Sequence, residues 1–131
     1  MTLAYVDTSV LLAIAFREPG CRELQERLST YPRAVSSNLL EAELRSGLAR
    51  EGMDFEADFL AGIGWILPYR SLRTEIDLAL SAGYLKGADL WHVAIALYVS
   101  PAPEETVFFT RDRRQRSVAQ ALGFRVQEAS P

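Results

Sequence analysis

Short apolar segments rich in β-forming residues alternate with helix-like segments along nearly the whole chain, and this alternation constrains the fold more than any other feature. Parallel strands need a long crossover connection, which a helix usually supplies. We therefore predict an α/β domain with a mostly parallel central sheet of four to five strands. The expected strands are 3–6, 34–36, 65–67, 107–109 and 124–126.

Breaker and capping residues divide the remaining segments into helices. Pro19-Gly20 ends the first helix, and Gly123 ends the last. Thr8 or Ser9 is a suitable N-cap for the first helix. No repeat, low-complexity segment or linker interrupts the pattern, so we predict a single domain over residues 1–131. The expected helices are 9–16, 21–28, 39–50, 55–60, 72–82, 88–99 and 113–122.

Charge and cysteine content exclude several classes of protein. The formal net charge of -3 argues against a domain that binds nucleic acid by overall charge, although it leaves room for a local basic groove. The single cysteine allows no internal disulfide, which fits a reducing compartment. The start lacks the basic segment of a signal peptide, and no apolar run reaches the roughly 18 residues of a membrane span. We expect a cytoplasmic protein with no membrane partner.

Three aspartates stand at positions that a purely structural account does not require. Asp7 interrupts the apolar run AYVDTSVLLA, Asp89 opens the apolar helix DLWHVAIAL, and Asp112 closely follows the strand VFFT. Each alone is most simply a helix cap. Together they predict a site, because the carboxyl ends of parallel strands converge at one edge of the sheet. Gathered carboxylates repel one another unless a cation binds, and oxygen ligands favour Mg²⁺ or Mn²⁺ over zinc.

The helix at 39–50 offers a fourth acid, but its periodicity leaves two choices. Glu41 and Glu43 lie on opposite margins of the apolar stripe at about 100° per residue. Both could be solvated, and Glu41 could pair with Arg45 one turn later. The stripe consists of Leu40, Leu44, Gly47 and Leu48.

The ordered set YVDTS, EAELRSGL, GADLWHVAIAL and FFTRD…ALGFRV resembles the PIN-domain ribonucleases, and among them the VapC-type toxins of bacterial toxin–antitoxin pairs. The likeness extends from Val6 to Val126. It implies a PIN-like three-layer α/β/α sandwich. It also implies a metal-dependent endoribonuclease that hydrolyses phosphodiester bonds of tRNA, rRNA or mRNA with Mg²⁺ or Mn²⁺, as the toxin of a type II toxin–antitoxin system.

The resemblance assigns roles to four acids. Asp7 matches the family's first metal-binding aspartate, and Asp89 matches a family aspartate that would ligate the metal directly or through water. Asp112 would complete the metal shell or hold a second, weaker ion. Glu43 matches the family's helix glutamate and would orient or deprotonate the attacking water. Many relatives carry one more acid shortly after the position of Asp112. Here the corresponding residues are Arg113, Arg114, Gln115 and Arg116, which favours a four-acid site.

Neighbouring polar residues have candidate roles beside simpler structural ones. The hydroxyls of Thr8, Ser9 and Thr110 would either hydrogen-bond the metal ligands or cap helices. His92 lies on an apolar helix, and we expect it to be packed and hydrogen-bonded rather than catalytic. A basic group would either contact the RNA backbone or form a solvated face; it consists of Lys86, Arg111, Arg113, Arg114 and Arg116.

The resemblance also implies partners, namely a cognate antitoxin and a homodimer or a toxin–antitoxin hetero-oligomer. An apolar group could form the antitoxin surface or simply close the core; it consists of Phe55, Phe59, Leu60, Ile63 and Trp65. Two other functions remain open on this fold: an RNA-processing nuclease outside a toxin–antitoxin pair, and a non-catalytic protein-binding module. A haloacid-dehalogenase-like phosphatase would need a second aspartate where Ser9 stands.

Overall fold

Five parallel strands form one sheet, in the order β3-β2-β1-β4-β5, in a computed structural model that describes residues 2–127. The register aligns Ala4 of the central strand with Ala34 on one side and Val107 on the other. The predicted parallel α/β architecture is confirmed; the predicted domain also contains residues 1 and 128–131, which lie outside the described part. The strands are β1 Leu3–Val6, β2 Arg33–Ser37, β3 Ile63–Ile66, β4 Thr106–Phe109 and β5 Arg125–Val126.

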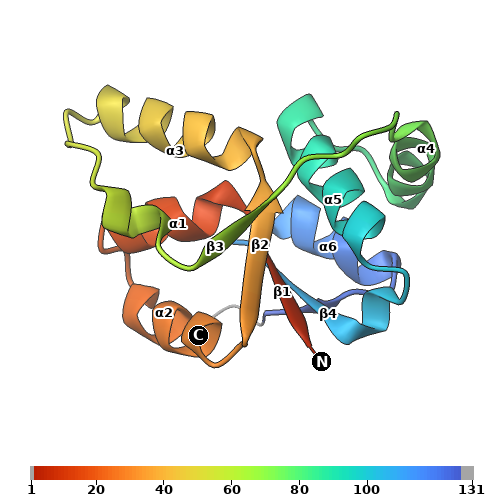
Figure 1. The fold of residues 1–131 in the computed structure, drawn as a ribbon, viewed down its shortest axis with the longest axis horizontal. Coiled ribbons are helices and arrows are strands. Elements are labelled where there is room, and N and C mark those ends of the chain that lie inside the picture. The colour runs from red at the N-terminus through yellow and green to blue at the C-terminus, as the bar shows by residue number, and fades with distance from the viewer. Residues whose placement is uncertain (1, 128–131) are drawn as a thin grey trace.

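Helices cover both faces of this sheet, as the three-layer prediction required (Figure 1). One layer consists of α1 Thr8–Ala15, α2 Cys21–Ser29 and α3 Leu39–Arg50. The other consists of α4 Arg73–Ala82, α5 Gly87–Val99 and α6 Arg113–Ala121. The short 3-10 helices η1 Ala57–Leu60 and η2 Pro103–Glu105 precede β3 and β4. Within residues 2–127, no helix is long and apolar enough to cross a membrane.

Alternation along the strands creates two hydrophobic cores, because successive side chains of a strand point to opposite faces. Tyr5 and Phe108 pack among α4, α5 and α6, whereas Val6 and Phe109 pack among α1, α2 and α3. All four side chains are fully buried. A sheet that is buried on both faces explains why its strands are almost continuously apolar.

Three local predictions need correction. The expected helix at 55–60 is only the 3-10 turn η1, because a six-residue helix is too short to be stable without a cap and this one has no side-chain cap. Strand β3 begins at Ile63 and ends before Leu67, since Pro68 cannot continue a hydrogen-bonded ladder. The first helix is capped by Asp7 and not by Thr8 or Ser9.

The direction in which successive strands are added to the sheet reverses beside β1. The chain leads from β1 outward to β2 and β3, then returns across the sheet to pair β4 with the other side of β1. In open parallel sheets, a crevice forms beyond the carboxyl ends of the strands at such a point. Asp7 follows β1 directly and Asp112 follows β4 after two residues, so both lie at this end of the sheet.

Candidate active site

Asp7 is a buried carboxylate at the junction of β1 and α1. Its backbone N–H donates to the carbonyl oxygen of Phe109 at 2.9 Å, which extends the β1–β4 ladder by one residue. Its Oδ2 accepts from the backbone N–H of Ser9 at 3.0 Å, and its Oδ1 accepts from Nε2 of Gln115 at 3.1 Å. These two donors reduce the cost of burying a side chain that is only 4% exposed.

Four acids line one pocket of about 520 Å³ at the carboxyl end of the sheet. They come from four different elements or junctions: Asp7 precedes α1, Glu43 lies in α3, Asp89 lies in the first turn of α5, and Asp112 caps α6. The fold therefore brings together the four acids named from the sequence, which are separated by up to 105 residues in the chain (7 to 112).

The electrostatics of Asp89 reflect this gathering. Burial raises the pKa of Asp89, and the negative charges of Asp7, Asp112 and Glu43 raise it further. Asp112 is held by the backbone N–H of Gln115, which donates to its Oδ1 at 2.8 Å. The pocket thus concentrates negative charge that a bound cation would stabilise.

Glu43 is oriented by two contacts that both fall on its Oε1. The hydroxyl of Thr8 donates to this oxygen at 2.7 Å, and Nε2 of His92 lies 2.7 Å from it. Burial raises the pKa of Glu43, but the hydrogen bonds from His92 and Thr8 and the charge of His92 outweigh it, so the pKa is lowered overall. Glu43 is therefore held in its ionised form, as a water-orienting base requires.

His92 is completely buried, and its Nε2 contacts Glu43 on the side of the carboxylate that faces the core. Its Nδ1 lies 2.8 Å from the hydroxyl of Tyr5, which itself accepts the backbone N–H of Ser37 at 3.1 Å. The two ring nitrogens therefore contact Tyr5 on one side and Glu43 on the other, and these contacts fix the orientation of the imidazole. The structure places His92 in a packed and hydrogen-bonded position, as expected from the sequence.

The two glutamates of α3 have separate environments, which the helical periodicity alone left open. Glu43 lines the acidic pocket. Glu41 pairs with Arg45 at 3.2 Å on the exposed side of the helix. The surface pairing considered for Glu41 is therefore present, and Glu43 is the α3 acid that the pocket contains.

The three hydroxyls named as possible partners of the acids all belong to this network. Thr8 bonds Glu43, as described above. The Ser9 hydroxyl accepts the backbone N–H of Arg111 at 2.9 Å and lies 3.3 Å from the Thr110 hydroxyl. Thr110 accepts the backbone N–H of Asp112 at 3.0 Å. These contacts fix the loop after β4 against the start of α1.

The basic group, for which RNA contact and a solvated face were both considered, does not line the pocket. Arg116 is turned inward, since its Nη2 donates to the carbonyl of Thr110 at 3.0 Å and its buried Nε has no hydrogen-bond partner within the described residues. Arg114 packs over the ring of Tyr84 at 5.8 Å. Arg111, Arg113 and Lys86 are exposed.

Two residues of the site escaped the sequence analysis. Arg50 lines the pocket, and its spacing of seven residues from Glu43 places both on one face of α3, which is the signal that could have found it. Gln115 is fully buried against Asp7. In the sequence it stood out only as one of the positions where many relatives carry a further acid and this chain does not. No spacing rule predicts that contact, because it depends on how α6 docks on β1.

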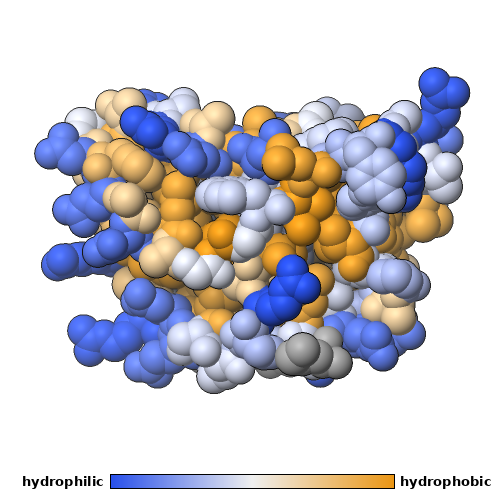
Figure 2. All heavy atoms as spheres, viewed as in Figure 1, coloured by the Kyte–Doolittle hydropathy of each residue, from blue (hydrophilic) through white to orange (hydrophobic). Residues whose placement is uncertain are grey.

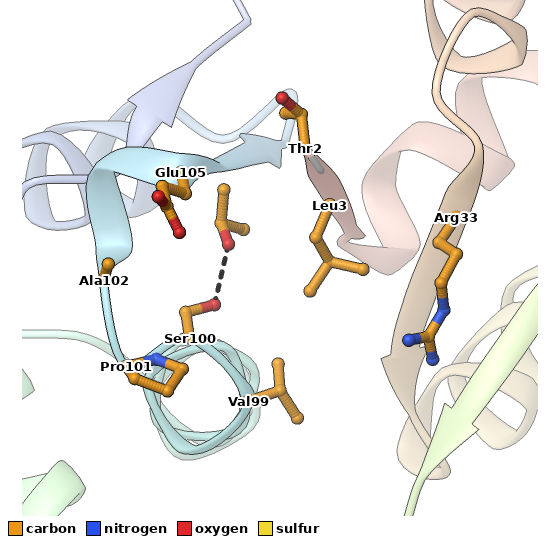
Figure 3. Close-up of a pocket in the computed structure, with 9 residues that line it drawn as sticks. Thr2, Leu3, Arg33, Val99, Ser100, Pro101, Ala102 and Glu105 are labelled. Atoms are coloured by element: carbon orange, nitrogen blue, oxygen red, sulfur yellow. Dashed lines mark hydrogen bonds between the residues drawn. The ribbon is translucent and has the colours of Figure 1, made fainter.

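Other hollows lack such chemistry. A pocket of about 220 Å³ lies at the amino ends of β1 and β4 (Figure 3). There the hydroxyls of Ser100 and Thr106 bond each other at 2.9 Å, and the one acid of the lining is Glu105. A third hollow of about 380 Å³ lies among α2, η1 and β3 and is lined largely by apolar side chains. The acidic pocket is the candidate active site.

The acidic pocket fits a hard divalent cation by its donor chemistry. Four carboxylates supply only oxygen ligands, and the pKa of Asp89 is raised by burial and then by the negative charges of the other three acids. Within residues 2–127, no three side chains among His, Cys, Asp and Glu already form a grouping that could hold a metal ion. The fit therefore rests on ligand type and charge and not on a preassembled coordination shell.

Comparisons with known proteins agree with this architecture. Residues 4–121 match the PIN domain family. Comparison with curated proteins finds no match. Among solved structures, the crystal structure of VapBC2 from Rickettsia felis, bound to a DNA fragment from their promoter, is similar with a TM-score of 0.64 and 14% sequence identity. The match covers 96% of this chain and 98% of that chain. At this level of identity, the likeness is one of fold.

Proposed function

The chain belongs to the PIN-domain family, and from this premise we propose that it is a metal-dependent endoribonuclease acting as the toxin of a type II toxin–antitoxin system. One observation carries the proposal: four carboxylates from separate elements line a single pocket at the carboxyl end of the sheet. A non-catalytic module would not need to gather charges that repel one another. The proposed catalytic residues are Asp7, Glu43, Asp89 and Asp112.

Asp7, Asp89 and Asp112 are the residues that would hold the cation. When bound, Mg²⁺ or Mn²⁺ neutralises the phosphodiester and lowers the pKa of a coordinated water. Asp7 is suited to this because its hydrogen bonds from Ser9 and Gln115 fix the carboxylate plane. Burial and the neighbouring negative charges raise the pKa of Asp89, so a nearby cation would stabilise its ionised form.

Glu43 would orient the attacking water and accept its proton. Both of its hydrogen bonds within the described residues fall on Oε1, which leaves Oε2 for the water. Its lowered pKa keeps it ionised at neutral pH. His92 and Thr8 act through Glu43 and are positioning residues, since His92 is fully buried and has no access to a substrate.

Arg50 is the proposed first contact for the RNA backbone, because it is the arginine that the pocket lining contains. The exposed Arg111, Arg113 and Lys86 would contact the strand further from the scissile bond, and Arg114 could join them after leaving Tyr84. Arg116 is not proposed to bind RNA, because its guanidinium is committed to Thr110.

The proposed antitoxin site is the apolar hollow among α2, η1 and β3. The structurally similar VapBC2 was solved as a complex of two proteins, which supports a partner for this fold. Phe59 and Ile63 border the hollow, although both also pack against the core formed with α1 and α3. Phe55 and Leu60 pack against the same core and do not line the hollow, so all four residues serve the core first. We also propose a homodimer of this chain, which rests on the family resemblance as the antitoxin does.

A cleavage assay tests the proposed activity. Purified protein is incubated with total tRNA and rRNA fragments in Mn²⁺ or in EDTA, and Asp7→Asn and Asp89→Asn are compared with the wild type. We expect cleavage only with Mn²⁺ and a loss of more than about 100-fold in both variants, because each removes charge that stabilises the transition state.

Glu41→Gln is the matched control, since it removes an acid from α3 outside the pocket. It should cleave like the wild type. Equal cleavage by the wild type and Asp7→Asn would contradict the site. Growth arrest on expression, relieved by a small gene encoded next to this one, separates a toxin from an RNA-processing nuclease.

A further inference from the structure

Gln115 places a side-chain amide in a fully buried position beside the acids. A buried amide is costly unless its polar atoms are hydrogen-bonded. Here each of them is: Nε2 donates to Oδ1 of Asp7 at 3.1 Å and to the backbone carbonyl of Asp89 at 3.3 Å, and Oε1 accepts from the hydroxyl of Thr110 at 2.6 Å. The groups that satisfy this amide all belong to the acidic pocket or to its supporting loop.

The hydrogen-bond network fixes which way the amide faces. The Thr110 oxygen accepts the backbone N–H of Asp112, and its own proton is donated to Oε1 of Gln115 at 2.6 Å, which is much closer than Oδ2 of Asp7 at 3.5 Å. The two N–H groups of the amide then point to Asp7 and to the backbone of Asp89. The amide therefore presents donors, and not an acceptor, to the buried carboxylate.

These contacts join three elements at one point. Gln115 lies in the first turn of α6, Asp7 directly follows β1, and Asp89 lies in the first turn of α5. The backbone N–H of Gln115 also donates to Oδ1 of Asp112 at 2.8 Å. One residue thus bonds two of the acids and the backbone of a third.

We propose that Gln115 is a positioning residue. It holds the metal-binding carboxylates in fixed positions relative to one another, and its neutral donors offset part of their mutual repulsion. This inference rests on the proposed function, because it assigns Gln115 a role toward the cation of that site. A residue of equal size without donors would fill the same space but leave the Asp7 Oδ1 without its partner. Outer partners of this kind typically change metal affinity by about 10- to 100-fold when removed.

The test measures Mn²⁺ binding to the purified full chain by titration calorimetry, with free Mn²⁺ followed by its electron paramagnetic resonance signal. Gln115→Met keeps the length and volume of the side chain and removes both donors. We expect it to weaken Mn²⁺ binding by about 10-fold or more.

Two controls separate this role from a general loss of stability. Val118→Ala opens the packing of the same helix, because Val118 is buried in the core on the α4–α6 side. It should lower the melting temperature while leaving the Mn²⁺ affinity within about twofold of wild type. Gln120→Leu changes an exposed glutamine of α6 and should alter neither quantity.

The outcomes are distinct. Wild-type affinity in Gln115→Met, or an equal loss of affinity in Val118→Ala, overturns the role of Gln115 and leaves the proposed function standing. A wild-type protein that binds no Mn²⁺ overturns the proposed function itself. If Gln115→Met does not fold, Thr110→Val replaces it: loss of the hydroxyl that orients the amide should also weaken Mn²⁺ binding, and unchanged affinity would refute the inference.

Discussion

At the scale of single residues, Asp7 shows that capping a helix and lining the candidate active site are compatible. Its Oδ2 accepts the Ser9 N–H that a helix cap binds, while the carboxylate still lines the pocket. The sequence alone favoured a cap for each aspartate taken separately. The convergence of the four acids was predictable, because parallel strands bring their carboxyl ends together. The contacts of Gln115 and Arg50 were not, because they depend on how α6 and α3 are rotated against the sheet.

The repulsion among the acids predicts a gain in stability on neutralising one of them. Asp89→Asn should raise the melting temperature of the metal-free protein, because burial and three neighbouring negative charges disfavour its carboxylate. The gain should be modest, about 0.5 kcal/mol, since the side chain is partly exposed and its charge is screened. Thermal unfolding in EDTA at neutral pH measures it.

The control for this gain is Glu41→Gln. Glu41 is also an acid in the first turn of a helix, so its loss removes the same favourable interaction with the helix dipole without relieving the pocket. It should not stabilise the protein. A metal-free Asp89→Asn variant that melts at or below the wild-type temperature would show that the acids do not repel one another appreciably.

At the scale of elements, strong periodicity and clear terminators made the boundaries predictable. Helix α3 begins and ends where expected, at Leu39 and Arg50, and β1 has its expected bounds. The segment before β3 was less predictable, because its apolar residues fit a short helix while their burial depends on contacts with the α1–α3 core. The position of β3 along the chain is set by its register with β2 and by Pro68.

The close approach of α1 and α3 predicts a size limit at Gly47. A Cβ at this position would lie 2.8 Å from Cδ2 of Leu12, a side chain that itself lines the acidic pocket. Gly47→Ala should be nearly neutral, because the end of Leu12 can move and alanine favours a helix by about 1 kcal/mol. Gly47→Val should lower the free energy of unfolding by about 1–3 kcal/mol through overpacking.

Chemical denaturation measures both variants, with Ala49→Val as the control. Ala49 is exposed on the same helix, so this change carries only the lower helix propensity of valine. If Gly47→Val were no less stable than Ala49→Val, the two helices would not be as closely packed as described.

At the scale of the whole molecule, the acidic pocket and the apolar surfaces occupy different parts of the fold. The acidic pocket lies at the carboxyl end of the sheet, whereas the hollow among α2, η1 and β3 lies on one face of the sheet. Figure 2 shows apolar residues gathered in the middle of the face that β3 crosses in Figure 1, with hydrophilic residues at its margins. Exposed residues continue this surface beyond β3, with Leu67 at 66% and Tyr69 at 90% exposure.

This separation matters for the proposed assembly, because a partner seated on the apolar side would leave the acids accessible unless part of it also reached them. The overall charge of -3 likewise does not describe the site, since four of the 17 acids are gathered in one pocket beside Arg50. The central claim is therefore about one location, where the four carboxylates of Asp7, Glu43, Asp89 and Asp112 meet.

The most direct test of that claim is a crystal structure of the wild-type protein grown with Mn²⁺, with anomalous diffraction used to locate the ion. The account predicts an anomalous peak within coordination distance of Asp7 and Asp89, and no such peak in crystals of Asp7→Asn grown in the same solution. A fully resolved pocket with no anomalous peak at saturating Mn²⁺, or ordered Mn²⁺ bound only elsewhere on the molecule, would contradict it.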